Sequence, residues 1–423
     1  MALRRFALLV FALVLCAPAM LAAPPGARAQ DGSGWQVESI APLSDLVPQA
    51  SRFAFPAPDA VHVAVIIPDG ESNLACAFNL DTETSVCVPL PEEIGRGFVM
   101  GSLPPVVWAP DSQRLAVVGL PLQFFVDNDL TVVDFAAQTA TVLAPDETTG
   151  ALPLGEPGDA IIDVQPAWSP DGSRIAVERT QWGDEDRIGR IAIIDAATGE
   201  EVSSLEQPVL SSEGFNFGVT MALDWSPDGA SLAFGRYEPG PAAAKSGVWL
   251  FDVDPSAEAP FTAPREILSL ADAEALMQTA PQGIAVLSGF VWSPDGAAAL
   301  VWVHNPYEGE QRILLYNAAD GTLSALPRPG GVAETDSDMM AAWSPDGSAI
   351  LVASVVEEAD PAKMLVEDVQ SERSVGLWLV DRAAGASQLL GYVPFMPVPT
   401  TRGAWNEDGD VLLGGYRLHI AQN

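Results

Sequence analysis

The pentapeptide WSPDG at residues 168–172 decides the fold, because the same five residues return three more times along the chain. The further copies lie at 225–229, 292–296 and 343–347, with the variants APD (57–59), WAPDS (108–112) and WNEDG (405–409). The repeated aspartates are Asp59, Asp111, Asp171, Asp228, Asp295, Asp346 and Asp408. A long, regular repeat of this kind indicates one supersecondary unit that is iterated many times.

Each copy has the chemistry of a tight turn between two β-strands. Proline presets φ, aspartate suits the next position, and glycine adopts the left-handed conformation that closes the turn. Runs rich in apolar residues follow, such as IAVE (175–178), and a second apolar run then ends in Asp or Asn, such as IAIID (191–195). A further turn and strand follow, as in AADGTLSAL (318–326). Each unit therefore predicts a four-stranded antiparallel sheet.

Seven such units predict an all-β fold, a seven-bladed β-propeller of four-stranded antiparallel blades. The last unit is short, because the chain ends at Asn423 and leaves room for two strands after Asp408. We expect WQVESI (35–40) to supply the missing outer strand and to close the ring, which hides strand edges. Since the first copy lacks its Trp and the last copy is short, six or eight blades are the alternatives.

The repeat resembles the TolB-type WD-like (WD40-like) propeller family. The resemblance rests on the five Trp-containing copies closest to the consensus and covers roughly residues 50–416. It implies a propeller fold, and it implies little about function, because such scaffolds serve many roles. TolB carries an additional α/β domain before its propeller, and this chain has no room for one between residue 30 and the first repeat.

The N-terminus reads as a signal peptide over residues 1–29. Arg4 and Arg5 precede the apolar stretch 6–23, and Ala27-Arg28-Ala29 offers a cleavage site of small residues. The uninterrupted apolar core before Pro18 is too short for a spanning helix, and no later segment is long enough. We therefore expect residues 30–423 to form a single exported domain, periplasmic or secreted, with no integral membrane segment.

The charge balance restricts the partners. The formal net charge is −36, with 56 Asp and Glu against 20 Lys and Arg. Such a field repels nucleic acid and anionic lipid. We expect a monomer that binds a protein partner, or a neutral or cationic ligand, at the envelope. Solubility is the simpler explanation for the acidity.

Two cysteines, Cys76 and Cys87, remain after cleavage of the signal peptide. They lie within LACAFNLDTETSVCV (74–88), which reads as a hairpin that places them opposite each other. An oxidising compartment would allow a disulfide between them. A metal site is the weaker alternative, because no further soft ligand is near in the sequence.

The connections between strands differ in length. The turns after the first and third strands are short, whereas the other connections are long, namely 180–190, 237–247, 304–312, 355–373, 143–164 and 271–289, the last with a short helix in ADAEALMQ. Long loops on one face are where such scaffolds bind, and we place the ligand face there, around the channel mouth. The candidate residues are Trp182, Asp184, Asp186, Tyr237, Tyr307, Glu357, Glu358 and Asp360. The structural alternative is that the aromatic residues cap blades and the acids are solvated.

No catalytic motif is present. The three histidines, His62, His304 and His419, lie far apart in repeat order, and metal chemistry would need several of them together. We therefore expect a non-catalytic binding scaffold, with a glycan-active hydrolase or lyase using carboxylates at the channel mouth as the alternative. We expect no cofactor. Calcium is the alternative at the oxygen-rich stretches NEDGD (406–410) and DND (127–129), neither of which matches a calcium loop.

One tryptophan recurs in each of six repeats, directly before the turn. These residues are Trp108, Trp168, Trp225, Trp292, Trp343 and Trp405. The regular position predicts a structural role, with each indole packed between adjacent blades. A stacking site for sugars is the functional alternative.

Overall fold

A computed structural model describes most of the strands and turns of the chain. The described residues are 34–47, 54–69, 72–91, 106–118, 126–127, 129–143, 150–151, 161–182, 187–206, 220–236, 246–253, 264–277, 286–305, 310–366, 373–396 and 402–422. The signal peptide predicted over residues 1–29 lies outside these ranges. In the described part, no helix has the length and apolar character that crossing a bilayer requires.

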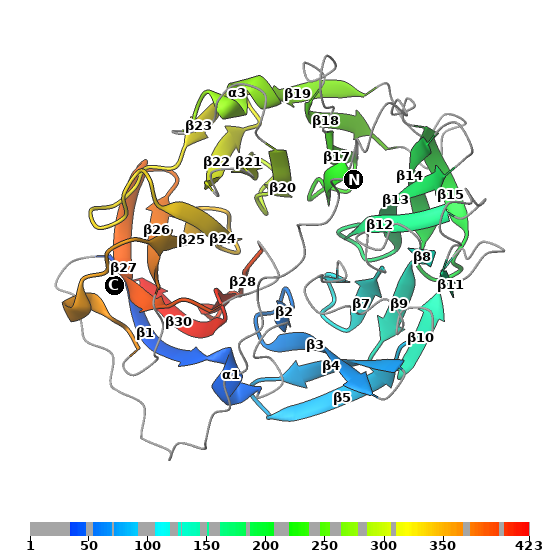
Figure 1. Ribbon diagram of the computed structural model, residues 1–423, viewed down its shortest axis with the longest axis horizontal. Coiled ribbons are helices and arrows are strands. Elements are labelled where there is room, and N and C mark those ends of the chain that lie inside the picture. The colour runs from blue at the N-terminus through cyan, green and yellow to red at the C-terminus, as the bar shows by residue number, and fades with distance from the viewer. Residues whose placement is uncertain are drawn as a thin grey trace, which may run out of the picture.

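Seven four-stranded antiparallel sheets form a ring, as predicted (Figure 1). Blades 1 to 3 comprise β2 (Ala54–Pro56), β3 (His62–Asp69), β4 (Ser72–Asn79), β5 (Thr84–Pro89); β6 (Val106–Trp108), β7 (Arg114–Val117), β9 (Thr131–Asp134), β10 (Thr139–Val142); and β12 (Ile161–Trp168), β13 (Arg174–Trp182), β14 (Arg187–Asp195), β15 (Glu201–Glu206). In chain order, β8 (Val126–Asp127) precedes β9 and β11 (Gly150–Ala151) follows β10, and the two pair as a separate two-stranded sheet.

The remaining blades follow the same order from the inside of the ring outward. Blades 4 to 6 comprise β16 (Thr220–Trp225), β17 (Ser231–Arg236), β18 (Gly247–Asp252), β19 (Arg265–Ser269); β20 (Val286–Trp292), β21 (Ala298–His304), β22 (Gln311–Asn317), β23 (Leu323–Ala325); and β24 (Ser337–Trp343), β25 (Ala349–Val356), β26 (Ser374–Asp381), β27 (Ala386–Pro394). In the described ranges, the short helices are α1 (Leu43–Leu46), α3 (Leu270–Glu274) and the 3-10 helix η3 (Pro361–Lys363). The helix expected in ADAEALMQ is thus present as α3.

Blade 7 closes the ring with both ends of the described chain. Its strands are β28 (Ala404–Trp405), β29 (Asp410–Leu413), β30 (Tyr416–Gln422) and, outermost, β1 (Trp35–Pro42). β1 pairs antiparallel with β30, from Trp35 opposite Gln422 to Pro42 opposite Tyr416. Figure 1 shows the blue N-terminal strand beside the red C-terminal one. The closure predicted from WQVESI is confirmed, and it leaves no unpaired edge on β30.

The repeated turn satisfies its own polar groups. In blade 3 the Ser169 hydroxyl donates to Asp171 Oδ1 over 2.6 Å, and the Ser173 backbone N–H donates to the same oxygen over 3.0 Å. These bonds stabilise the ionised carboxylate and lower the pKa of Asp171 to about 2. Gly172 has a φ of 66°, a conformation that favours glycine. The aspartate of the motif therefore stabilises the turn.

The recurrent tryptophans pack between blades, as predicted. Four indole N–H groups donate to a backbone carbonyl on the inner strand of the preceding blade, namely Trp108 to Phe55 (2.8 Å), Trp168 to Val107 (3.1 Å), Trp225 to Ala167 (3.1 Å) and Trp343 to Val291 (3.4 Å). Trp405 instead packs edge-on against Trp35 of the closing strand, with ring centroids 5.5 Å apart. Trp292 lies edge-on to Phe290 at 5.2 Å.

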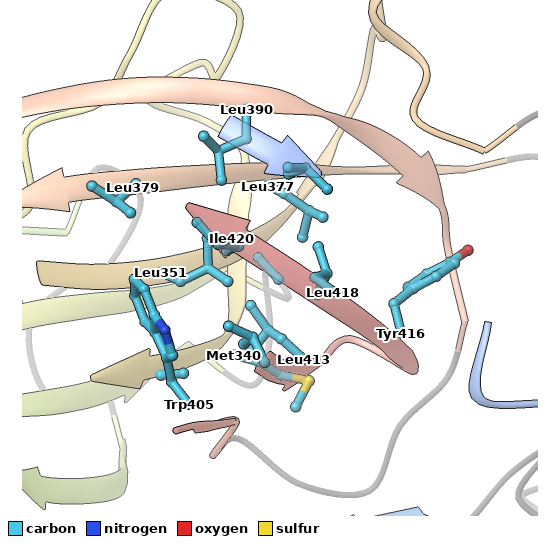
Figure 2. Close-up of a cluster of buried hydrophobic side chains, with 14 of the residues drawn as sticks. Met340, Leu351, Leu377, Leu379, Leu390, Trp405, Leu413, Tyr416, Leu418 and Ile420 are labelled. Atoms are coloured by element: carbon cyan, nitrogen blue, oxygen red, sulfur yellow. The ribbon is translucent and has the colours of Figure 1, made fainter. Parts of the chain in front are cut away.

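The apolar core of the described residues falls into seven clusters, and each joins two neighbouring blades. Figure 2 shows the cluster between blades 6 and 7, where Leu351 and Leu377 face Leu418 and Ile420. Burial of aliphatic side chains stabilises each interface in proportion to the apolar area removed from water. Because every blade contributes to two clusters, the ring depends on each of its interfaces.

Candidate functional site

The two faces of the ring differ in construction. One face, here called the turn face, carries the connections after the first and third strands of each blade. Its polar groups bind neighbouring blades: Arg114 Nη2 donates to the Gly172 carbonyl over 2.9 Å, and Arg382 Nη2 donates to Asp295 Oδ2 over 2.9 Å. Asn406 Nδ2 likewise donates to the Asp59 carbonyl. These polar groups of the turn face thus stabilise the contacts between neighbouring blades.

The opposite face, here called the long-connection face, carries the connections between second and third strands and between blades. In blades 4 to 6, the longest connections between second and third strands are 237–246, between β17 and β18, and 357–373, between β25 and β26. The connection 270–285 carries α3. Between their second and third strands, blades 1 and 7 have only the short segments 70–71 and 414–415. The connections between second and third strands therefore differ in length around the ring.

Two expectations about connection lengths were wrong. The loop expected over 180–190 is mostly strand, because β13 and β14 remain paired up to Trp182 opposite Arg187. The connection after the third strand of blade 4 is long, since β18 ends at Asp252 and β19 begins at Arg265. Its three prolines (255, 260 and 264) lack the N–H that a strand ladder needs, and they delay the fourth strand.

The predicted ligand-face residues divide into two groups. Asp184, Asp186, Tyr237 and Tyr307 lie outside the described residues, and Trp182 is the last residue of β13. Glu357, Glu358 and Asp360 lie in the connection of blade 6 and are exposed. The Asp360 carboxylate accepts the Ala362 backbone N–H over 3.0 Å and so caps η3.

The blade 6 connection runs to the outer rim of the ring. The Leu365 backbone N–H donates to the Tyr392 carbonyl over 2.8 Å, and Met364 forms a parallel bridge with Tyr392. Tyr392 belongs to β27, the outermost strand of its blade. The described half of this connection thus covers a strand edge. The segment that follows Glu357, Glu358 and Asp360 thus leads outward, and a binding role for these three residues stays a prediction.

A buried ion pair lies beneath the long-connection face in blade 3. Asp163, on the inner strand β12, is 1% exposed, and its carboxylate lies 2.9 Å from Arg179 Nε. Asp163 Oδ2 also accepts the Leu130 backbone N–H of blade 2 over 3.0 Å. Burial raises the pKa of the Asp163 carboxyl, and the Arg179 guanidinium opposes that rise. This carboxylate therefore joins two blades.

Blade 6 repeats the arrangement at the equivalent place. Asp338, on the inner strand β24, accepts the Ile313 backbone N–H of blade 5 over 3.0 Å and the Ser354 hydroxyl over 2.7 Å. Arg328 Nη2 donates to the same carboxylate over 2.7 Å. The Trp378 indole N–H donates to Ser354 and extends the network. Burial raises the pKa of Asp338, with Arg328 opposing the rise.

These two aspartates were missed in the sequence. Each stands five residues before the tryptophan of its repeat, Asp163 before Trp168 and Asp338 before Trp343. In the described part, their oxygens are engaged by arginine and backbone N–H groups. We call Asp163 and Asp338, with their arginine partners, the buried floor of the long-connection face. Because their oxygens are already engaged, these carboxylates hold the inner strands rigidly and are poorly placed to exchange protons with a substrate. The glycan-active alternative, which places its carboxylates at the channel mouth, stays a prediction.

A third carboxylate on an inner strand also pairs with an arginine. Asp224, on β16 of blade 4, accepts Arg402 Nη2 over 3.0 Å and the Trp292 backbone N–H over 2.9 Å. Arg402 precedes the inner strand of blade 7, and it also donates to the Phe290 carbonyl of blade 5 over 3.1 Å. Burial raises the pKa of Asp224, and Arg402 opposes that rise. Arg402 therefore braces the inside of the ring across several blades.

The histidines stay apart, as their repeat positions indicated. His62 Nδ1 lies 2.6 Å from Asp59 Oδ2 within blade 1, and His419 Nδ1 lies 3.0 Å from Asp410 Oδ1 within blade 7. Burial lowers the pKa of His304 on β21. Among the residues that the structure describes, no three His, Cys, Asp or Glu side chains form a group that could hold a metal ion.

The stretch NEDGD folds as the seventh copy of the turn. Asn406 Oδ1 accepts the backbone N–H groups of Asp408 (3.1 Å) and Asp410 (2.9 Å). The Asp410 carboxylate lies 3.1 Å from Arg417 Nη2. These oxygens therefore already serve the turn and the closing blade. Calcium at this stretch, or at DND (127–129), stays an untested alternative.

The two cysteines lie directly opposite each other in blade 1. Cys76 of β4 pairs in register with Cys87 of the outermost strand β5, and their sulfurs are bonded at 2.05 Å. Cys76 is fully buried, whereas Cys87 is exposed. The bond ties the edge strand of blade 1 to its neighbour.

Comparisons with known proteins agree on the fold. No protein-family model matches the chain, and no curated protein resembles it in sequence. An oligogalacturonate lyase in complex with manganese is 14% identical, with a TM-score of 0.51 over 92% of this chain and 95% of that chain. The oligogalacturonate lyase of Vibrio parahaemolyticus is 14% identical, with a TM-score of 0.50 over 89% and 92%. TolB from Acinetobacter baumannii is 14% identical, with a TM-score of 0.37 over 84% and 78%.

The protein is therefore a seven-bladed β-propeller. At 14% identity the similarity to the lyases establishes the fold alone, since one scaffold hosts unrelated functions. The TolB-type repeat remains a resemblance that rests on the WSPDG copies.

Proposed function

We propose that this protein is an exported, non-catalytic binding scaffold that presents its long-connection face to a protein partner or to a neutral or cationic ligand. The observation that carries the proposal is the asymmetry of the two faces. On the turn face, motif residues such as Asp171 and Asn406 are used within turns and between blades. On the other face, long connections rise from strands that are held by buried ion pairs.

The buried floor supports a scaffold that binds with little rearrangement. Asp163 and Asp338 each accept a backbone N–H from the preceding blade and pair with an arginine inside the protein. Such paired groups fix the inner strands relative to each other, and an element held in this way presents its loops at constant spacing. Rigid presentation lowers the entropic cost of binding.

The charge of the chain supports the class of partner. With a net charge of −36, the molecule attracts cationic surfaces and repels anionic ones over the Debye length. Glu357, Glu358 and Asp360 place exposed carboxylates on the long-connection face. A basic protein surface is therefore the favoured partner, with faster association at low salt.

A capture experiment tests the proposal. The protein is immobilised and exposed to an envelope extract of its source, beside a Glu357→Lys/Glu358→Lys variant and a variant whose 357–373 segment is replaced by a short glycine-serine turn. We expect both variants to lose most of the specifically captured protein. Shortening the segment also removes the packing of Leu365 on the blade 6–7 core, so it affects stability as well as binding. The charge-reversal variant keeps this packing and therefore tests binding separately.

The chain offers a matched control on the turn face. The turn at 196–200 in blade 3 is replaced by the equivalent turn at 318–322 of blade 5, since both close with a glycine of positive φ, Gly199 at 74° and Gly321 at 70°. Capture by this turn-swap variant should equal that of the unmodified protein. Equal capture by all four forms, or loss only in the turn swap, would overturn the proposal.

A further inference from the structure

A small surface pocket lies where the closing blade meets blade 1. Its volume is about 150 Å³, and its lining residues are Asp45, Leu46, Val47, Phe78, Asn79, Leu80 and Glu83. One wall is α1 with Val47, which follows the ring-closing strand β1, and the other is the end of β4 with its turn. A cavity of this volume accommodates a benzene-sized group. One side chain of a partner therefore fits it.

The base of the pocket is apolar. Val47 is 1% exposed and Leu80 is 7% exposed, so both belong to the core between blades 7 and 1. Phe78 is half-buried beside them, and Leu46 at the rim is 37% exposed, which is high for a leucine. Covering this surface with aliphatic groups would be favourable in proportion to the area buried.

Two carboxylates at the rim lack a cation. Asp45 and Glu83 are exposed, and neither forms an ion pair or a side-chain hydrogen bond in the part of the chain that the structure describes. Arg417, the arginine of the same seam, is already shared between Asp81 (2.5 Å) and Asp410 (3.1 Å). The apolar base favours an occupant with an aliphatic part, and the two uncompensated carboxylates at the rim favour one with a positive charge.

We propose that this pocket binds a lysine or arginine side chain of a protein partner. The aliphatic stem of such a residue covers Leu46 and Phe78, while its cationic head stays at the rim beside Asp45 and Glu83. An uncharged side chain of equal length would leave both carboxylates without a cation, and an acidic one would be repelled. The proposal does not rest on the binding face proposed above.

Methyl-labelled full-length protein provides the test. The probes are the peptide acetyl-Gly-Lys-Gly-amide and its norleucine analogue, which keeps the stem and removes the charge. We expect saturable shifts of the Leu46, Val47 and Leu80 methyl signals, with the norleucine peptide binding roughly fivefold more weakly, the effect of one or two exposed ion pairs. Equal affinity for both peptides, or the absence of saturable shifts at these methyls, would overturn the proposal.

Variants separate the pocket from general acidity. Asp45→Asn/Glu83→Gln should abolish the preference for lysine over norleucine, whereas Glu357→Gln/Glu358→Gln, which removes two charges elsewhere, should leave it unchanged. If the first variant keeps the preference, the assignment is wrong. The chain's own Arg52, outside the described residues, is the rival occupant. A gain in peptide affinity in Arg52→Ala would assign the pocket to that residue and overturn the proposal.

Discussion

The Arg402 guanidinium of blade 7 lies 3.0 Å from the Asp224 carboxylate of blade 4, although 178 residues separate them in the chain. The same segment touches the blades between them. Arg402 Nη2 donates to the Phe290 carbonyl of blade 5, and the Gly403 backbone N–H donates to the Ala341 carbonyl of blade 6. Blade 7 is thus held from the inside by Arg402 and from the outside by β1.

Removing this brace should weaken the ring. In Arg402→Met, Asp224 keeps the Trp292 N–H but loses its cation. We therefore expect the free energy of unfolding to fall by about 1–2 kcal/mol. This is the lower range for an uncompensated charged group, because Arg402 is 44% exposed. Lys363→Met, which removes an exposed cation from η3, is the control and should change little. Urea unfolding measures both.

The buried floor should matter more. Asp338→Asn removes the buried carboxylate beside the 5% exposed Arg328 guanidinium and leaves it the exposed Glu334 at 3.8 Å. Breaking a buried pair by changing one partner costs about 3–5 kcal/mol. Glu358→Gln, an exposed change on the same face, should cost almost nothing. If calorimetry finds the two variants equally stable, the carboxylate at 338 is not a structural support for this face.

The repeated turns predict a dependence on acid. The Ser169 hydroxyl and the Ser173 N–H lower the pKa of Asp171 to about 2, and the Arg382 guanidinium and the Ser293 hydroxyl, outweighing burial, lower that of Asp295 to about 2. A carboxyl whose pKa is lowered in the folded state stabilises above its ordinary value of 3.8, and that contribution is lost as the pH falls towards 2. Stability should therefore decline across this window.

The control for this prediction is Asp171→Asn/Asp295→Asn, which keeps an acceptor in each turn and removes the titration. The free energy of unfolding of this variant should be lower at neutral pH and should change less between pH 4 and 2. Parallel curves for both proteins, followed by circular dichroism, would show that these turns do not carry the acid sensitivity.

The blade 1 disulfide should stabilise the protein wherever it forms. The bond joins cysteines 11 residues apart, and closing a loop of this length in the unfolded chain is worth about 3 kcal/mol in the chain-entropy model. Cys76→Ser/Cys87→Ser should lower the melting temperature, and a reductant should lower it only in the unmodified protein. Alkylation of both thiols in protein purified without reductant would contradict the prediction.

Much of the fold was predictable because the sequence repeats once per blade. The WSPDG copies gave seven blades, WQVESI gave the closing strand, and Trp108 and its equivalents gave the interfaces. Tertiary contacts decided the rest. The direction of the connection 357–373 depends on the hydrogen bond from Leu365 to Tyr392, which joins two segments distant in sequence. Asp163 and Asp338 have counterparts in no other described repeat, so the periodicity of the sequence could not reveal these two aspartates.

Site-specific photo-crosslinking tests the central claim, that the long-connection face binds the partner. A photoreactive phenylalanine is placed at Glu358 or at Ala275 beside α3, both exposed on that face, and at Ala197 or Ala319, both exposed in short turns of the opposite face. In cells of the source organism, we expect a discrete adduct from at least one position of the first pair and none from the second. Adducts confined to Ala197 or Ala319 would contradict the account.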